Sequence, residues 1–390
     1  MNLARIRLLA QVQRSLRRTP VTLLLGPRQC GKTTLAKAIA AQNKRCTWFD
    51  LEDPETSLRA GIAKQVLAPL RGLVVIDECQ REPALLPLLR VLADRRPLPA
   101  RFLLLGSASP TLVRGAAETL AGRISHCEMG GFDLGDIAAA RRSALWLRGG
   151  FPRSFLARSE RDSFAWRGDF VQTFLERDLP NLGVRVPAAT LRRFWTMLAH
   201  HHGGIWNAAE LARSMGTGEV AVRHHVDLLT GAFVVRQLAP WMTNVGKRLV
   251  KAPKVYIRDS GLVHYFLGIR DRLGLLAHPV LGASWEGFVV DQVIRRLDAE
   301  RDAFFYRTHA GAELDLLIVR GSRRFGFEAK HGDTPTVTKS MHVAQQDLGL
   351  DHLWVVHPGE RSYPMDDGIS ALAIDDLDAL AQERRFGLPG

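Results

Sequence analysis

The segment VTLLLGPRQCGKTTLAKAIA, residues 21–40, constrains this chain most. Its apolar first part is typical of a buried strand, and its last part has the spacing of a helix. Between them, Gly26-x-x-x-x-Gly31-Lys32-Thr33 matches the phosphate-binding loop that joins a strand to a helix. The glycines let backbone N–H groups surround phosphates, Lys32 reaches the terminal phosphates, and the Thr33 hydroxyl is a ligand for Mg²⁺. The residues predicted to bind nucleotide are Gly26, Pro27, Arg28, Gln29, Cys30, Gly31, Lys32, Thr33 and Thr34.

A second apolar run, LVVIDE at residues 73–78, ends in two acidic residues. A phosphate-binding loop needs a second strand that delivers a carboxylate to the metal, and Asp77 is placed to hold Mg²⁺ through water. Glu78 follows it and can polarise the attacking water. The alternative is a buried strand that happens to end in two acids, and the loop upstream favours the metal and catalytic roles.

Three further apolar runs complete a predicted sheet. They are RFLLLGSAS (101–109), CTWFDLED (46–53) and ISHCEM (124–129). Ser107 ends the first of these runs, where a polar residue between the two ligand-bearing strands could sense the γ-phosphate. Five short strands with helical or loop segments between them predict an α/β domain with a parallel sheet, whose ligands lie at its carboxyl edge.

Hydrolysis also requires a cation beside the developing negative charge. Arg123, in LAGRIS (120–125), follows the Ser107 strand and is predicted to be an arginine finger or sensor, in cis or from a neighbouring subunit. A surface arginine in an arginine-rich chain is the alternative. The predicted catalytic residues are Lys32, Glu78, Ser107 and Arg123, with Thr33 and Asp77 as metal ligands.

Length and charge add bounds to these motifs. A chain of 390 residues, 46% of them apolar, predicts two or three domains. The formal charge is +13, and no Asp or Glu occurs before Asp50, which favours nucleic acid as a partner, with a general arginine bias as the alternative. No apolar run approaches the ~18 residues that span a bilayer, so we expect a cytoplasmic protein without a membrane partner. The four cysteines are scattered, which fits reduced thiols.

The middle of the chain has the order of a helix-turn-helix with a basic wing. Asn207 caps a first helix, Gly216 lies in the turn, and a second helix follows Thr217. FVVRQL (233–238) and KVYI (254–257) are predicted strands joined by a basic stretch. This order predicts contact with DNA, although winged helices also bind proteins. The residues predicted to bind DNA are Arg223, His224, Lys247, Arg248, Lys251 and Lys254.

The last part of the chain carries acids on predicted helices and strands. SWEGFVVDQVIRRL (284–297) is predicted to be a helix capped by Ser284, with Glu286 in its first turn. Two strands follow around a turn, and the second begins with Glu313 and Asp315 on one face. Glu313 either substitutes for Asp315 or is solvated.

The next strand, FGFEAKH (325–331), places Glu328 and Lys330 on one face. We expect this order of elements to bring Glu286, Asp315 and Glu328 together, where carboxylates could hold one or two Mg²⁺ or Mn²⁺ ions that activate water against a phosphodiester. Lys330 would orient the water or stabilise charge. Solvated charges on an amphipathic strand are the alternative. The predicted nuclease residues are Glu286, Asp315, Glu328 and Lys330.

These segments together resemble a large family of prokaryotic AAA-type ATP-binding proteins that carry a C-terminal domain of unknown function. That domain is similar to the restriction-endonuclease-like PD-(D/E)xK nucleases. The resemblance covers nearly all of the chain and rests on GPRQCGKTTLA, VVIDECQ, LLLGSAS, LAGR, GGFPRSFL, NAAELARSMG, KAPKVYIRDSGLVHYFLG, WEGFVV, GAELDLLI and FEAK. One departure concerns the nuclease pattern, because Leu314 precedes Asp315 where the pattern has proline.

The resemblance implies four parts and the use of ATP. They are an AAA-type P-loop ATPase core (1–145), a winged-helix segment (191–272), a restriction-endonuclease-like α/β domain (273–390) and, from the helical pattern between the first two, a helical lid or connector (146–190). The resemblance implies no biological role, and our first hypothesis is Mg²⁺-dependent ATP hydrolysis coupled to a DNA-binding winged helix and a nuclease-like domain, in genome defence or mobile-element biology. The alternatives are a nucleotide-gated switch that binds DNA or protein through an inactive nuclease fold, and a signalling ATPase. Arg123 hints at a homo-oligomer with shared ATP sites.

Overall fold

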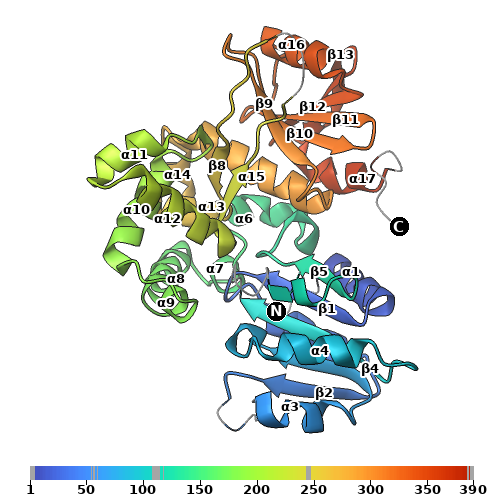
Figure 1. Cartoon of the computed structure of the whole chain (residues 1–390). Coiled ribbons are helices and arrows are strands. Elements are labelled where there is room, and N and C mark those ends of the chain that lie inside the picture. The colour runs from blue at the N-terminus through green and yellow to red at the C-terminus, as the bar shows by residue number, and fades with distance from the viewer. Residues whose placement is uncertain are drawn as a thin grey trace. The chain divides into compact units, whose positions relative to one another are not determined.

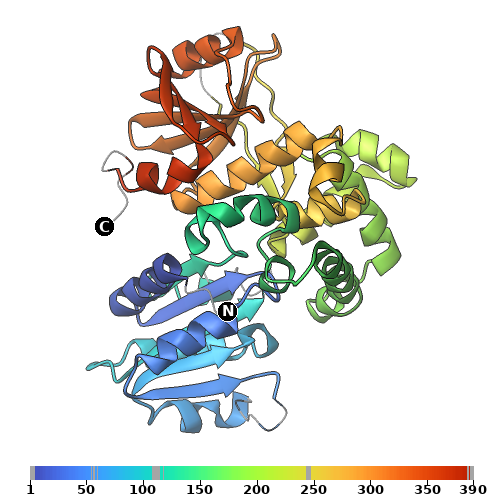
Figure 2. The ribbon, with the colours of Figure 1, turned by 180° about the vertical axis from the view of Figure 1, so that it is seen from behind.

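The computed structural model describes residues 5–53, 55, 58, 60–107, 115, 116, 118–242, 247–383 and 386. The chain divides into two compact units, whose elements are shown in Figures 1 and 2. Unit 1 consists of Met1–Gly131, Arg177–Val184 and Gly231–Phe233, and unit 2 consists of Phe132–Glu176, Arg185–Thr230 and Val234–Gly390. Among the helices of the described ranges, none has both the length and the apolar character needed to cross a membrane.

Unit 1 is built on a five-stranded sheet in which every neighbouring pair of strands is parallel. Its order is β2 (Cys46–Asp50), β3 (Gly72–Asp77), β4 (Ala100–Ser107), β1 (Val21–Gly26) and β5 (Ile124–Glu128). The predicted α/β class with a parallel-sheet core is therefore confirmed. Because the strands are parallel, the ends of β1, β3 and β4 meet at the same carboxyl edge.

Helices cover both faces of this sheet (Figures 1 and 2). The helices α1 (Ile6–Arg18) and α2 (Lys32–Ala41) pack on one face, and α3 (Ala60–Leu67) and α4 (Leu85–Ala93) pack on the other. Strand β1 is buried at every position. This two-sided burial explains why its sequence is a continuous apolar run rather than an alternating one.

Helices dominate the first part of unit 2. They are α6 (Arg142–Arg148), α7 (Pro152–Phe155), α8 (Glu160–Thr173), α10 (Ala188–His200), α11 (Ala208–Met215) and α12 (Glu219–Gly231). Asn207 caps α11 as predicted, because its side chain accepts from the Glu210 N–H at 3.2 Å. Gly216 ends α11 with a φ of 67°. After α8, a π-helix (Phe174–Asp178) and α9 (Leu179–Asn181) carry the chain into the unit 1 segment Arg177–Val184.

The two strands predicted after α12 form a small antiparallel sheet. Its order is β6 (Gly204–Ile205), β8 (Lys254–Ile257) and β7 (Val235–Leu238). The connection from β7 to β8 lies along β9 (Ala303–Arg307), where the Trp241 N–H donates to Phe305 O at 2.7 Å. This hydrogen bonding keeps the described part of the predicted wing from projecting freely. Residues 243–246 of that wing lie outside the described residues.

A six-stranded mixed sheet forms the last part of unit 2. Its order is β13 (Tyr363–Asp366), β14 (Ile369–Ala373), β12 (His352–His357), β11 (Arg323–Ala329), β10 (Glu313–Arg320) and β9. The pairs within β9-β10-β11 are antiparallel, whereas β11-β12-β14 run parallel. The helices of this region are α13 (Ser260–Phe266), α14 (Arg272–Leu276), α15 (Leu281–Arg296), α16 (Lys339–Leu348) and α17 (Leu377–Ala381).

The helix that carries Glu286 begins earlier than predicted. It starts at Leu281, so Ser284 is not its cap and Glu286 does not lie in its first turn. Ser284 is 1% exposed, and its hydroxyl lies 2.7 Å from His264 Nε2 and accepts from Trp146 Nε1 at 3.0 Å. The prediction was wrong because this serine hydrogen-bonds to buried side chains of other helices rather than to its own backbone.

Candidate nucleotide-binding site

The phosphate-binding loop runs from the end of β1 to the start of α2. The backbone requires glycine at both motif positions, for two different reasons. Gly26 has no room for a side chain, because a Cβ there would lie 2.0 Å from the Met129 backbone oxygen. Gly31 has a φ of 102°, in the left-handed region that glycine adopts without strain. It directly precedes Lys32, the first residue of α2. The backbone therefore has the sharp turn that a phosphate-binding loop requires.

The other predicted loop residues lie between these glycines or directly after them. Gln29 has a φ of 62°, a second left-handed position in the same turn. Cys30 is buried, and its thiol donates to Met129 O at 3.4 Å. Thr34 is exposed in the first turn of α2. Cys30 therefore anchors the loop to the chain that follows β5, whereas Thr34 faces solvent.

Lys32 folds over the loop. Its ammonium group donates to the carbonyl oxygens of Gly26 at 3.0 Å and Pro27 at 2.9 Å, and the residue is only 6% exposed. The first turn of α2 lies beside it, where the helix dipole adds positive potential. An anionic phosphate at the end of β1 would meet both of these positive groups.

The two predicted metal ligands are in contact. Thr33 Oγ1 donates to Asp77 Oδ2 at 2.8 Å, which joins the second residue of α2 to the end of β3. Asp77 is buried, and burial raises the pKa of its carboxyl group, while the Thr33 hydrogen bond partly offsets this. A hydroxyl beside a buried carboxylate is the oxygen set that Mg²⁺ binds together with nucleotide phosphates. These residues therefore fit a magnesium ion.

Glu78 turns away from the line of β3. Its φ is 52°, an uncommon left-handed conformation for a non-glycine residue and one that clusters at functional sites. One carboxylate oxygen, Oε2, accepts from Ser107 Oγ at 3.3 Å and from Gln80 Nε2. Gln80 Oε1 in turn accepts from the Ser107 N–H at 3.2 Å. The structure thus brings Ser107 beside Glu78, and it adds Gln80, which the sequence analysis missed.

Arg28 joins the loop to three carboxylates. Its Nη1 pairs with Asp178 Oδ1 at 2.7 Å, and its Nη2 lies 2.5 Å from Glu52 Oε1 and 3.8 Å from Glu78 Oε2. Burial alone would lower the pKa of Arg28, but the charges of Asp178 and Glu78 outweigh it and raise that pKa. Sequence reasoning missed Asp178 and Glu52, since Asp178 lies 150 positions from Arg28 and only the fold brings them together.

Arg123 lies at the other edge of the sheet. Its backbone oxygen accepts from the N–H of Val21, where β1 begins, and its guanidinium pairs with Asp94 at 2.7 and 2.9 Å. A six-residue strand spans about 20 Å, so the length of β1 separates Arg123 from the loop. The prediction that Arg123 acts in cis is wrong for this reason. A role in the site of a neighbouring subunit stays a prediction.

A second group of acids surrounds the Lys254 ammonium group in unit 2. Lys254 Nζ pairs with Glu286 Oε1 at 2.8 Å, Glu313 Oε1 at 2.6 Å and Asp315 Oδ1 at 3.2 Å. Lys254 is the first residue of β8 and is 2% exposed. The prediction that Lys254 contacts DNA is therefore wrong, because its charge is buried among carboxylates.

Glu328 and Lys330 adjoin this group. The Asp315 N–H donates to Glu328 Oε2 at 3.4 Å, and Lys330 Nζ donates to Glu328 Oε1 at 2.9 Å. Burial, and then the charge of Asp315, raise the pKa of Glu328 to about 8 and that of Glu286 to about 7. The four predicted nuclease residues thus lie in one cluster, with Lys254 inside it.

No set of three or more His, Cys, Asp or Glu side chains in the described part of the chain is arranged to hold a metal ion. Around Lys254, the ammonium group itself is the cation that the carboxylates contact. The predicted second Mg²⁺ or Mn²⁺ ion in the C-terminal region therefore has no support here.

The remaining residues predicted to bind DNA are exposed, and two of them pair with acids. Arg223 pairs with Glu219 at 3.4 Å on the outer face of α12, where Asp227 is also exposed, next to His224. Lys247 pairs with Asp347 at 2.6 Å. Arg248 and Lys251 are also exposed, in the connection to β8. The outer face of α12 therefore has no excess of positive charge.

Three family models match the chain. Residues 18–138 match an AAA domain, residues 140–273 match a domain of unknown function (DUF8612), and residues 281–377 match another (DUF4143). The first match confirms the AAA-type part of the resemblance. The likeness of the C-terminal region to nucleases stays an expectation.

Two curated relatives are similar over most of the chain. They are the uncharacterized proteins Mb2031c of Mycobacterium bovis and Rv2008c of Mycobacterium tuberculosis, each 50% identical over 368 residues, which is 94% of this chain and 83% of the relative. Among solved structures, the Walker-type ATPase PABY2304 of Pyrococcus abyssi is similar with a TM-score of 0.48 and 15% identity, over 68% of this chain and 96% of that one.

Proposed function

Because the chain belongs to the same family as the mycobacterial proteins Mb2031c and Rv2008c, and its residues 18–138 match an AAA domain, we propose that it is a magnesium-dependent ATPase. The contact of Thr33 with Asp77 at 2.8 Å, next to Glu78, carries this proposal. It unites the phosphate-binding loop with the acids of β3, which is the arrangement that phosphoryl transfer to water requires.

Each residue of the site has a role in this reaction. Thr33 and Asp77 would hold Mg²⁺, which neutralises charge on the phosphates when it is bound. Lys32 exchanges its two loop carbonyls for the terminal phosphates. Glu78 takes the proton of the attacking water, and Ser107 fixes the Glu78 carboxylate through Oε2.

Phosphate release by purified protein, with and without Mg²⁺, tests this function. We expect Mg²⁺-dependent release by the wild type. Glu78→Gln should reduce the rate by about 10²-fold or more, because general base catalysis contributes that much, while ATP binding persists. Lys32→Ala should weaken ATP binding itself. Hydrolysis by Glu78→Gln at the wild-type rate would contradict the proposed role of Glu78.

We further propose that the ATPase cycle acts on DNA, and that unit 2 is its effector. The formal charge of +13 supports a polyanionic partner. Whether the acidic cluster cleaves DNA depends on Lys254. Its ammonium group contacts Glu286 and Asp315, so a divalent cation would have to displace a buried charge. This observation favours the second candidate function, a nucleotide-gated switch with an inactive nuclease fold.

Cleavage of plasmid and linear single-stranded DNA, with Mg²⁺ or Mn²⁺ and with or without ATP, separates the two candidates. The wild type is compared with Glu328→Ala and Lys330→Ala. Cleavage that both variants lose would establish an active nuclease and exclude the switch. Intact DNA under every condition, with ATP hydrolysis preserved, is the result expected of the switch.

A further inference from the structure

Basic side chains gather at the amino edge of the unit 1 sheet. Each strand begins directly after, or within two or three residues of, an Arg or Lys. The cations of this edge are Arg17 and Arg18 before β1, Lys44 and Arg45 before β2, Arg71 before β3, Arg95, Arg96 and Arg101 around the start of β4, and Arg123 before β5. The register aligns these starts, since Val21 pairs with both Phe102 and Ile124. We call these residues the basic edge.

The basic edge carries a large excess of positive charge. The five segments that form this edge contain a single acidic residue, Asp94, which pairs with Arg123. These segments are residues 14–20, 42–46, 68–72, 94–101 and 121–124. Arg17, Arg45 and Arg71 are exposed. The carboxyl edge has the opposite character, because β2, β3 and β5 end in Asp50, Asp77 and Glu128.

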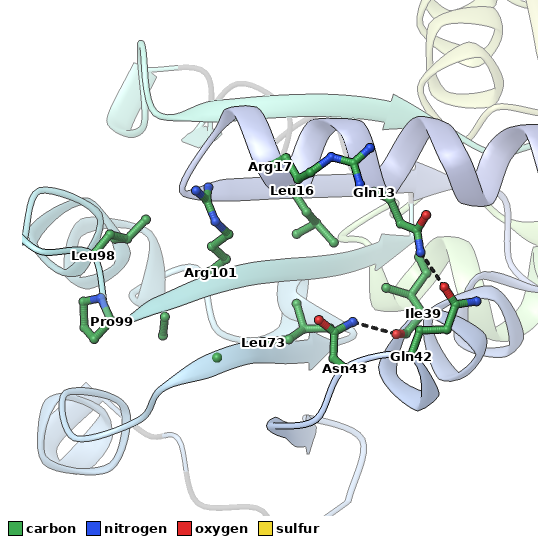
Figure 3. A pocket seen from close by; sticks show the side chains of 12 residues that line it. Gln13, Leu16, Arg17, Ile39, Gln42, Asn43, Leu73, Leu98, Pro99 and Arg101 are labelled. Carbon is green, nitrogen blue, oxygen red and sulfur yellow. Dashed lines mark hydrogen bonds between the residues drawn. The ribbon is translucent and has the colours of Figure 1, made fainter. Parts of the chain in front are cut away.

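An open groove of about 370 Å³ lies within the basic edge (Figure 3). It runs between α1 and α2, over the beginnings of β3 and β4. Among the described residues that line it, Arg17 and Arg101 are the charged ones, and none is a carboxylate. Its polar side chains are amides, with Gln13 donating to Gln42 Oε1 at 2.6 Å and Asn43 beside them. Guanidinium and amide groups without acids form a lining suited to phosphate oxygens.

We propose that the basic edge binds the phosphate backbone of a nucleic acid duplex. The proposal deepens the DNA association proposed above by naming its surface, and it does not depend on ATP hydrolysis. Four strand spacings separate β2 from β5, or about 19 Å, which matches about six base pairs of duplex. The cations are thus spread over a length along which duplex phosphates are also spread.

The composition of the basic edge favours nucleic acid over a protein partner. Protein interfaces usually have an apolar core. The exposed large apolar side chains in the described part of the chain are Ile6, Ile62, Val91, Val220, Met242, Leu273 and Leu276, and none of them belongs to the five segments of the basic edge. The basic edge also offers more charge than α12, whose exposed Arg223 lies between Glu219 and Asp227. A high density of positive charge with few exposed large apolar side chains is typical of a surface that binds a phosphate backbone.

Salt-dependent binding to a fluorescein-labelled DNA duplex tests the proposal. The affected variant carries Arg17→Glu, Arg45→Glu and Arg71→Glu. A matched control carries Arg185→Glu, Arg213→Glu and Lys339→Glu, which are exposed residues of unit 2 with the same change in net charge. Losing three phosphate contacts should lower the slope of log affinity against log salt by about 2.7, between about 50 and 200 mM salt. The control should keep the wild-type slope.

Equal slopes in the two triple variants would overturn the proposal. A second result would also overturn the proposal. If the wild type binds poly-glutamate but no duplex, and the Arg17→Glu, Arg45→Glu, Arg71→Glu variant no longer binds poly-glutamate, the basic edge binds an acidic protein. ATP binding and hydrolysis without DNA are measured in parallel, so a failure of the ATPase proposal is seen separately. Arg45→Glu and Arg71→Glu are also made singly, so that the slope can be measured if the triple variant does not fold.

Discussion

At the residue scale, the most constrained side chains are those whose hydrogen bonds determine their charge state. His264 is fully buried. Its Nδ1 lies 2.9 Å from Leu147 O and must donate to it, because a carbonyl oxygen only accepts. Its Nε2 lies 2.7 Å from the Ser284 hydroxyl and can then accept from it, while that hydroxyl accepts from Trp146. Every group in this series of hydrogen bonds has a partner when the imidazole is neutral. A second ring proton would remove the acceptor that the Ser284 hydroxyl needs.

This geometry predicts a loss of stability in acid. Burial lowers the pKa of His264 to about 3, and burial does the same to His202. An unfolded histidine titrates near pH ~6.5, so the unfolded state binds more protons between these values. The stabilisation is present above pH ~6.5 and is lost as the pH falls toward about 3, at about 1.4 kcal/mol per pH unit for each histidine. Urea unfolding at several pH values measures this slope.

Substitutions identify the histidines responsible. His264→Gln should remove about half of the acid-dependent loss that the two buried histidines cause, although the variant starts from a lower stability. His224→Gln is the matched control, because this side chain is exposed on α12. If His264→Gln kept the full wild-type slope, titration of this imidazole could not be the cause.

At the element scale, the acidic cluster shows that a side chain from one strand can determine what the acids of neighbouring elements bind. The elements α15, β10 and β11 present the acids, and β8 inserts the Lys254 ammonium group among them. Tyr256 on the same strand donates to Glu286 Oε1 at 2.6 Å. The Lys254 ammonium group therefore offsets part of the negative charge of the cluster, and ion pairs join β8 to α15 and β10.

Lys254→Met should destabilise unit 2 strongly. Removing one partner of a buried ion pair costs about 3–5 kcal/mol, because the carboxylates stay buried without a counter-ion. Lys251→Met, three residues earlier and exposed, should change stability by less than about 0.5 kcal/mol. The free energy of unfolding from urea titrations at neutral pH measures both. A Lys254→Met variant as stable as Lys251→Met would show that the ammonium group is not required to hold the cluster together.

At the scale of the whole molecule, we expect nucleotide to protect unit 1 from amide hydrogen exchange more than unit 2. A ligand that binds the folded state at 100 times its dissociation constant stabilises it by about 2.7 kcal/mol. With a non-hydrolysable ATP analogue and Mg²⁺, we expect slower amide hydrogen exchange in β1, β3 and β4. The segment Arg177–Val184 should follow unit 1, because Asp178 pairs with Arg28 of the loop. The six-stranded sheet of unit 2 should change less.

Hydrogen exchange followed by mass spectrometry resolves these segments. Lys32→Ala serves as the control, since the loss of the loop cation should abolish the protection. Protection of β1 without any change at Arg177–Val184 would show that the Arg28–Asp178 pair does not transmit nucleotide binding to this segment.

The sequence alone determined the features that depend on residue types within one short segment. A loop such as GPRQCGKTT needs glycine at fixed positions, and a buried strand such as LVVID is apolar throughout, so both are readable from residue types. The match to an AAA domain and the parallel sheet agree with these local signals. The strands that carry Glu313, Asp315 and Glu328 were likewise predicted from period-two patterns, although no local signal gave the start of the helix that carries Glu286.

Only the tertiary structure decided which side chains meet. Arg28 reaches Asp178 across 150 positions, and Lys254 enters a carboxylate cluster that its own segment does not contain. The Arg123 guanidinium meets Asp94, which lies 29 positions away at the end of α4. The physical reason is the same in each case. Charge pairing acts over a few ångströms in space, whereas a sequence pattern reports the turn, period and burial of its own segment.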